Sequence, residues 1–220
     1  MKSDFGKKFR FSKEGVFLFS LPIIWQIYHF VSPRSPFELI VASGIFFTIV
    51  PFVVVRFILR DNIYFLGFRR GFFGKGISGI LLGWIAFWPI LNFLADQTEF
   101  RQIYPPFNFM KENAVNLVLA EIFLILPIFF SVQTFLFGYV YEGFRRLMGK
   151  KISFVLLGLV GIPLFYWGQL PIEMVLSSLV GFTTLWIRER SKSIIYPILF
   201  GWGLSFILDF LIVYKIYAGA

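Results

Sequence analysis

The chain has 220 residues, of which 58% are hydrophobic and 15% are charged, and its formal net charge is +9. A soluble domain of this length cannot bury so much apolar surface, so the composition predicts a single integral membrane domain over residues 1–220. The absence of cysteine excludes disulfides and thiolate metal sites, and the single histidine, His29, argues against a zinc enzyme. We therefore expect no metal and no cofactor, and we attribute the positive charge to topology and membrane lipid contact, not to nucleic acid.

Long apolar runs of near-bilayer length follow one another along the chain and predict an all-α, polytopic helical bundle of about seven transmembrane helices. The expected spans are residues 15–32, 37–59, 74–95, 115–138, 152–168, 172–188 and 193–216.

Lysine and arginine alternate between the connectors in a way that supports this count. Seventeen of the 21 basic residues lie ahead of the first span or in the connectors at 56–75, 145–151 and 188–192. Because basic residues are retained on the cytoplasmic side, the alternation predicts a cytoplasmic amino terminus and an outside carboxyl terminus. We expect the membrane to be that of a bacterial or archaeal cell.

Gly76-Ile77-Ser78-Gly79, in the third span, is similar to the string around the nucleophile of rhomboid serine proteases. A serine nucleophile needs a base within hydrogen-bond reach, and the one histidine precedes this serine in the first span. Small residues such as Gly79 and Gly83, four apart, instead favour close helix packing.

Three ionisable residues are functional candidates inside the bilayer: Glu121 in the fourth span, Asp209 in the seventh, and His29 near the outer end of the first. Charged groups are costly at membrane depth and mark functional positions there. We expect Glu121 and Asp209 to be buried polar groups and His29 to lie among the headgroups. Glu142 is expected to form ion pairs with Arg145 and Arg146 on its own helix surface.

Framework residues in the region 67–216 follow an ordered pattern. Their positions are Leu66-Gly67-Phe68-Arg69-Arg70, the run Val132 to Arg146 with Gly138 and a final Arg pair, Phe165 to Pro171, and Pro197-Ile198 to Ser205. This order resembles the CAAX-protease and bacteriocin-processing (Abi) family of intramembrane glutamate proteases.

The resemblance implies that every ionisable position of the family motifs is substituted here. The substituted positions are Val132 and Gln133 for two glutamates, Phe137 for an arginine, Gln169 and Gly201 for two histidines, and Ser205 for an asparagine. Neither valine nor a glutamine amide is a general base near neutral pH. We therefore expect the family scaffold without its chemistry.

Three functions are compatible with this sequence. The first is a catalytically degenerate homologue that acts as a non-catalytic partner or regulator. Its family cavity would hold a lipid chain, a lipidated peptide or a helix of another membrane protein, and its lining would be Val132, Gln133, Phe137, Phe165, Gln169, Gly201 and Ser205. Gly201 and Gly203 are expected to leave extra room there, with Gln133 and Gln169 about one water apart. The second is an active endopeptidase with displaced residues such as Glu121, His29 or Asp209. The third is a small transporter or lipid-handling protein.

Overall fold

The structure is a computed structural model, and it describes residues 13–31, 35–103, 105–161 and 171–218. Every regular element in these ranges is helical, which confirms the predicted all-α class. The described residues form seven helical segments in the expected order: α1 (Lys13–Val31), the segment from α2 (Pro36–Gly44) to η2 (Val54–Ile58), α4 (Phe73–Asp96), the segment from α6 (Ala114–Ala120) into α8 (Tyr141–Leu156), the returning part of α8 with η7 (Leu157–Gly161), α10 (Pro171–Ser191) and α11 (Ile195–Ala218).

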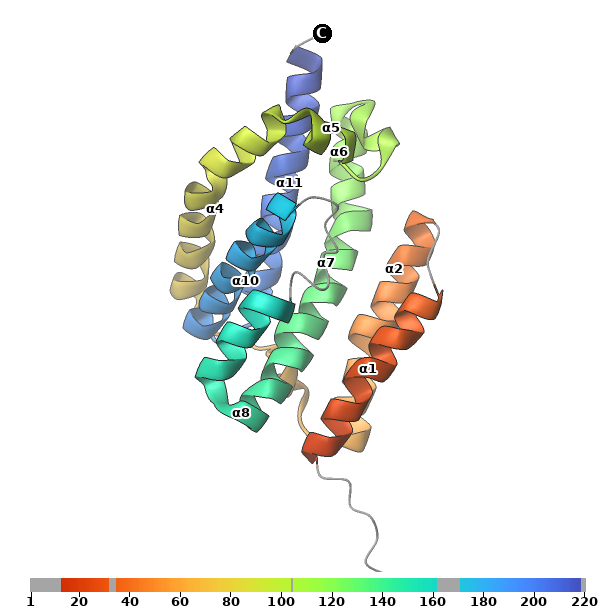
Figure 1. Cartoon of the computed structure of the whole chain (residues 1–220), viewed down its shortest axis with the longest axis vertical. Helices are drawn as coiled ribbons and strands as arrows, with labels where there is room; N and C mark the ends of the chain where they lie inside the picture. Colours follow the sequence, from red (N-terminus) through yellow and green to blue (C-terminus); the bar gives the residue numbers. More distant parts are fainter. Residues whose placement is uncertain (1–12, 32–34, 104, 162–170, 219–220) are drawn as a thin grey trace, which may run out of the picture.

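The fourth helix is longer than the sequence predicts. Its expected end is residue 138, but the chain stays helical through η6 (Thr134–Val140) into α8 and turns back at Gly149, whose φ is 79°. Figure 1 shows this reversal within α8. The predicted end was wrong, because the helix continues beyond the apolar run, where Glu142 and Arg145 form an ion pair of 3.2 Å one turn apart that stabilises it. The expected fifth span is described only as far as Gly161.

Two long helices change their hydrogen-bond spacing just before a proline. The π-helical segment η1 (Ile45–Ile49) precedes Pro51 of α3 (Val50–Val53), and η5 (Glu121–Ile125) precedes Pro127 of α7 (Leu126–Gln133). Proline has no N–H to donate and its ring crowds the preceding turn, so an extra residue is accommodated there. Each such segment rotates the following side chains relative to a regular α-helix.

Four of the described helices are long and apolar enough to cross a membrane. They are Pro36–Ile58, Phe73–Asp96, the segment that begins at Ala114, and Ile195–Tyr217, while Gly15–Val31 is apolar but shorter. Large apolar side chains project outward from them, as Phe57 does with 69% of its surface exposed and Ile85 with 70%. Outward apolar side chains of this kind suit a lipid surrounding.

The helix from Ala114 runs through the middle of the bundle (Figure 1). On one side α4, α10 and α11 pack against one another, and on the other α2 packs on α7 while α1 lies against α2 and α8. The largest buried cluster joins α1, η1, η2, η6 and α10, and Phe47, Tyr139 and Tyr141 are its largest fully buried side chains. The helix from Ala114 therefore holds the two halves of the bundle together.

Glycines on α4 allow its close approach to α11 and α10. A Cβ on Gly76 or Gly83 would overlap the ring of Tyr196 or Phe200, and one on Gly79 would lie 3.1 Å from the Ile187 side chain. Ser78 is exposed, and its hydroxyl bonds to the Lys75 carbonyl of its own helix. The string at 76–79 thus serves helix packing.

The connectors rich in basic residues lie at one end of the bundle. Asp61 lies 3.0 Å from Lys13 and 2.7 Å from Arg146, and Arg69 donates a hydrogen bond to the Lys192 carbonyl. The start of α1 and the end of α11 lie at opposite ends (Figure 1). An odd number of helical passes through the bundle produces this arrangement.

Candidate functional site

The fourth and last helices share a line of polar side chains between α7 and α11, which pack together. On α11, Gly201, Ser205 and Asp209 follow at intervals of four and so lie on one face. From the other helix, Gln133 and Glu121 reach toward this face. We refer to Gln133 with Gly201 as the glutamine–glycine contact, and to Glu121 with Asp209 as the acid pair.

The glutamine–glycine contact fills the space that the sequence led us to expect as a cavity. The Gln133 side-chain nitrogen occupies the position that a Cβ on Gly201 would take, and the Trp84 indole occupies the corresponding position at Gly203. The expectation of extra room at these two glycines was wrong, because long neighbouring side chains reach into the gaps. Gln133 is 3% exposed, and its carbonyl oxygen has no hydrogen-bond partner.

The remaining positions of the expected cavity differ in burial. Phe137 is buried within the largest apolar cluster, whereas Val132 and Ser205 are half-buried. Phe165 and Gln169 lie outside the described residues, so the expected proximity of Gln133 and Gln169 falls outside them too.

The acid pair lies farther along the same helices, and both residues are 0% exposed. The Trp202 indole N–H donates to one Glu121 carboxylate oxygen at 3.0 Å. The other Glu121 oxygen and both Asp209 oxygens receive no fixed donor. Instead, the two carboxyl groups lie within hydrogen-bond reach of each other. Two buried carboxylates repel each other when both are ionised, so a shared proton is the arrangement that satisfies them.

His29 is separate from the acid pair. It is exposed on α1, where its ring packs on Trp25 with centroids 4.3 Å apart. Within the described residues, no group of three or more His, Asp or Glu side chains gathers where it could hold a metal ion. The acid pair has two carboxyls and an indole donor, a set that suits proton exchange better than metal binding.

A second group of carboxylates lies at the basic end, and we call it the end network. Arg188, with 5% of its side chain exposed, bonds Glu142 at 2.7 Å, and its guanidinium lies 4.6 Å from the centroid of the Tyr141 ring. Glu189 bonds Lys150 at 2.6 Å and Lys192 at 3.1 Å. Burial acts to raise the pKa of Glu189, but these hydrogen bonds outweigh it and lower that pKa to about 2.

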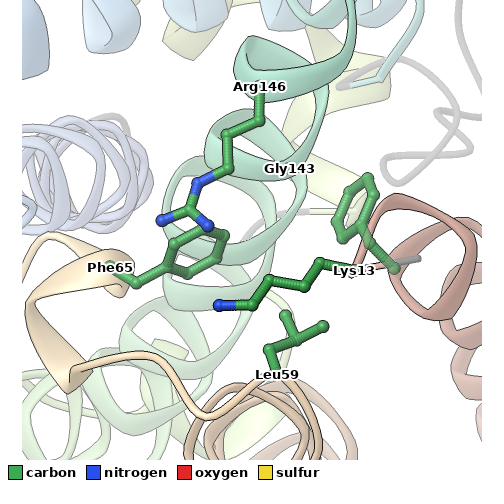
Figure 2. Close-up of a pocket in the computed structure, with 6 residues that line it drawn as sticks. Lys13, Leu59, Phe65, Gly143 and Arg146 are labelled. Carbon is green, nitrogen blue, oxygen red and sulfur yellow. The ribbon is translucent and has the colours of Figure 1, made fainter. Parts of the chain in front are cut away.

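A small pocket beside the end network lies between α1 and α8 (Figure 2). Lys13 and Arg146 extend into it, and the Arg146 guanidinium lies 4.3 Å from the centroid of the Phe65 ring. Both cations bond Asp61. Burial acts to raise the pKa of Asp61, but the two cations lower it below its usual value. We interpret this pocket as structural, because its two cations are paired with Asp61 and so join α1 and α8.

Sequence reasoning did not identify Trp202 and Arg188 as partners of the carboxylates, nor Asp61 as the partner of Lys13 and Arg146. Trp202 precedes Asp209 by seven residues, two helical turns, and that spacing is the one sequence signal for it. Arg188 and Asp61 carry no such signal, since their partners lie on other helices. Arg146 was expected to pair with Glu142, but it bonds Asp61 instead.

Comparison of the chain with protein-family models, curated proteins and solved structures found no match.

Proposed function

We propose that the chain is a seven-span membrane protein with its amino terminus and basic end in the cytoplasm. The gathering of the basic connectors at one end supports this, because such residues are retained on the cytoplasmic side. Single-cysteine variants test it cleanly, since the chain has no cysteine. With a membrane-impermeant maleimide and intact cells, we expect labelling of Glu99→Cys and protection of Arg190→Cys, both exposed positions. The reverse pattern would overturn the orientation, and equal labelling would overturn the number of spans between them.

Within this topology, we propose a catalytically degenerate homologue of the CAAX-protease family that acts as a non-catalytic binding partner or regulator. The observation that carries the proposal is the glutamine–glycine contact. The positions that match a family glutamate and a family histidine meet across α7 and α11, which supports the resemblance. They meet as an amide and a glycine, which supply neither a general base nor a group to orient water.

The filled contact also argues against hydrolysis. Proteolysis needs a water and a substrate carbonyl beside the base, and the Gln133 amide occupies that space. The partner would be membrane lipid, another membrane protein or a lipidated peptide, the substrate class that the resemblance implies.

A fluorescent farnesylated peptide with a CAAX carboxyl terminus tests this function on the full chain in nanodiscs. We expect saturable binding, weaker binding of the same peptide without farnesyl, and no cleavage by chromatography. Gln133→Ala opens the space beside Gly201 and should tighten binding several-fold. The matched control is Ser131→Ala, a buried residue of the same helix that bonds its own helix backbone at Pro127. Cleavage by the wild type would overturn the non-catalytic assignment, and unchanged binding by Gln133→Ala would place the peptide elsewhere.

A further inference from the structure

We propose that the acid pair is a proton-binding site, in which Glu121 and Asp209 share one proton at neutral pH and release it in alkali. Loss of that proton would weaken the contact between η5 and α11. Protonation of the acid pair does not depend on the partner-binding function proposed above.

Glu121 and Asp209 are buried without a full set of hydrogen-bond donors. Asp209 is 0% exposed and neither of its oxygens receives a hydrogen bond from a fixed donor. An ionised carboxylate left in this state is strongly disfavoured, because a buried charge without a partner loses its hydration. A carboxyl O–H between the two residues removes one charge and supplies the missing donor in the same step. The acid pair takes this proton from water and returns it to water on release.

The charged residues of the surrounding elements bond groups other than the acid pair or are exposed. Lys111 of η4 (Asn108–Lys111) acts on Asp209 electrostatically, yet its ammonium bonds the Arg101 carbonyl at 3.0 Å. On α11 itself, Lys215 bonds Asp96 at 2.7 Å. The charged residues on other elements near this end are used elsewhere or exposed: Glu112 accepts from Asn116, Arg101 lies 3.6 Å from Asp96, and Glu38 of α2 is exposed. No ion pair with the acid pair forms among the described residues, so a proton takes the place of a cation.

Glu121 begins the π-helical segment η5, and the Leu126 N–H bonds back to the Glu121 carbonyl five residues earlier. Such segments are frequent at functional sites because they redirect a side chain. Here the redirected side chain meets α11, where Trp202 and Asp209 lie two turns apart. The indole N–H fixes one Glu121 oxygen at 3.0 Å and leaves the other for Asp209.

Infrared difference spectroscopy on the full chain in nanodiscs tests the proposal. At neutral pH we expect a protonated-carboxyl C=O band that shifts in D2O and disappears in alkali. The band should be lost in the double variant Glu121→Gln/Asp209→Asn and retained in Asp96→Asn, a carboxylate with 60% side-chain exposure. A wild type without this band, or a double variant that keeps it, would overturn the proposal.

A thermal-unfolding series protects the test against a double variant that fails to fold. For the wild type we expect the unfolding midpoint to fall as pH rises from neutral to alkaline, because deprotonation leaves two like charges in contact. The isosteric single variant Glu121→Gln removes one of these charges, so its alkaline fall should be at least halved, while Asp96→Asn should keep the full fall. An equal fall in all three proteins would contradict the proposal. A midpoint that rises with sodium at constant ionic strength would show a metal cation in place of the proton and also overturn it.

Discussion

The acid pair and the end network both bury carboxylates in the same bundle, and they differ in what compensates the charge. In the end network, Glu189 bonds Lys150 and Lys192 and accepts the Tyr141 hydroxyl at 3.0 Å. In the acid pair, one indole N–H is the whole set of fixed donors among the described residues. A compensated carboxylate keeps its charge and holds helices together, whereas an uncompensated one keeps a proton. The first kind is structural, and the second can respond to its surroundings.

The largest expected effect follows removal of a cation from the end network. Arg188→Met keeps an unbranched apolar stem but removes the guanidinium, which leaves Glu142 with Arg145 alone at 3.2 Å. We expect a loss of about 3–5 kcal/mol in the free energy of unfolding, since a buried charge loses its closest partner. Unfolding of the detergent-solubilised protein measures it. Arg190→Met, on the exposed side of the same turn, is the control and should change little. Adding Glu142→Gln to Arg188→Met should recover most of the loss, because no buried charge then lacks a partner. If Arg188→Met lost no more stability than the control Arg190→Met, Arg145 alone would be a sufficient partner for Glu142.

The difference between the two sites also shows where sequence reasoning stops. Apolar length predicted the long helical segments, because a helix is the conformation that satisfies its own backbone in lipid, but it did not predict the short helices of the connectors, such as α5 (Thr98–Ile103). The burial of Glu121 and Asp209 agrees with the expectation from their depth in apolar runs. Their mutual contact was not predictable, since apolar helices match one another in many ways and the π-helical segment at Glu121 rotates the face.

The prediction of a cavity at Gly201 and Gly203 was wrong for a related reason. A glycine in a sequence shows that a Cβ is absent, but it does not show what occupies the space. At Gly201 and Gly203 the occupants are Gln133 and Trp84, and both come from other helices. The end network was similarly hidden, because basic connectors predict topology but not which cations are buried. Arg188 looks like any basic residue of its turn, yet 95% of its side chain is removed from solvent.

An effect of intermediate size is expected when Glu189 is protonated in acid. The end network should lose stability as pH falls, whereas the acid pair should lose stability as pH rises. The pKa of Glu189 is about 2 in the folded protein, against 4.5 for the free group, so its charge stabilises the fold above about pH 4.5. That contribution declines as pH falls from 4.5 toward 2. Glu189→Gln should therefore cost about 1.5–3 kcal/mol at neutral pH, the range for hydrogen bonds to charged groups.

The measurement is the difference in unfolding free energy between the wild type and Glu189→Gln over a pH series. The difference should stay level from neutral pH to about 4.5 and shrink below it. Glu99→Gln, an exposed carboxylate of α5 (Thr98–Ile103), serves as the control and should show a small difference throughout. A difference that grows in acid would contradict the assignment of Glu189 as a compensated carboxylate, because that is the behaviour of a group that prefers its protonated form.

The smallest effect is expected at Asp61, where compensation is complete but the cations are exposed. Lys13 and Arg146 have 54% and 47% of their side chains exposed, so water and salt screen their attraction to Asp61. Asp61→Asn should cost about 0.2–1 kcal/mol per ion pair at low salt, and most of this should vanish at about 1 M salt. The cost of Arg188→Met should persist at the same salt, because its partner lies out of reach of the ions. Unfolding of both variants at the two salt concentrations makes the comparison. If salt reduced the cost of both variants equally, burial would not distinguish the Arg188–Glu142 ion pair from the ion pairs of Asp61. Arg188 would then behave like an exposed cation of the basic end.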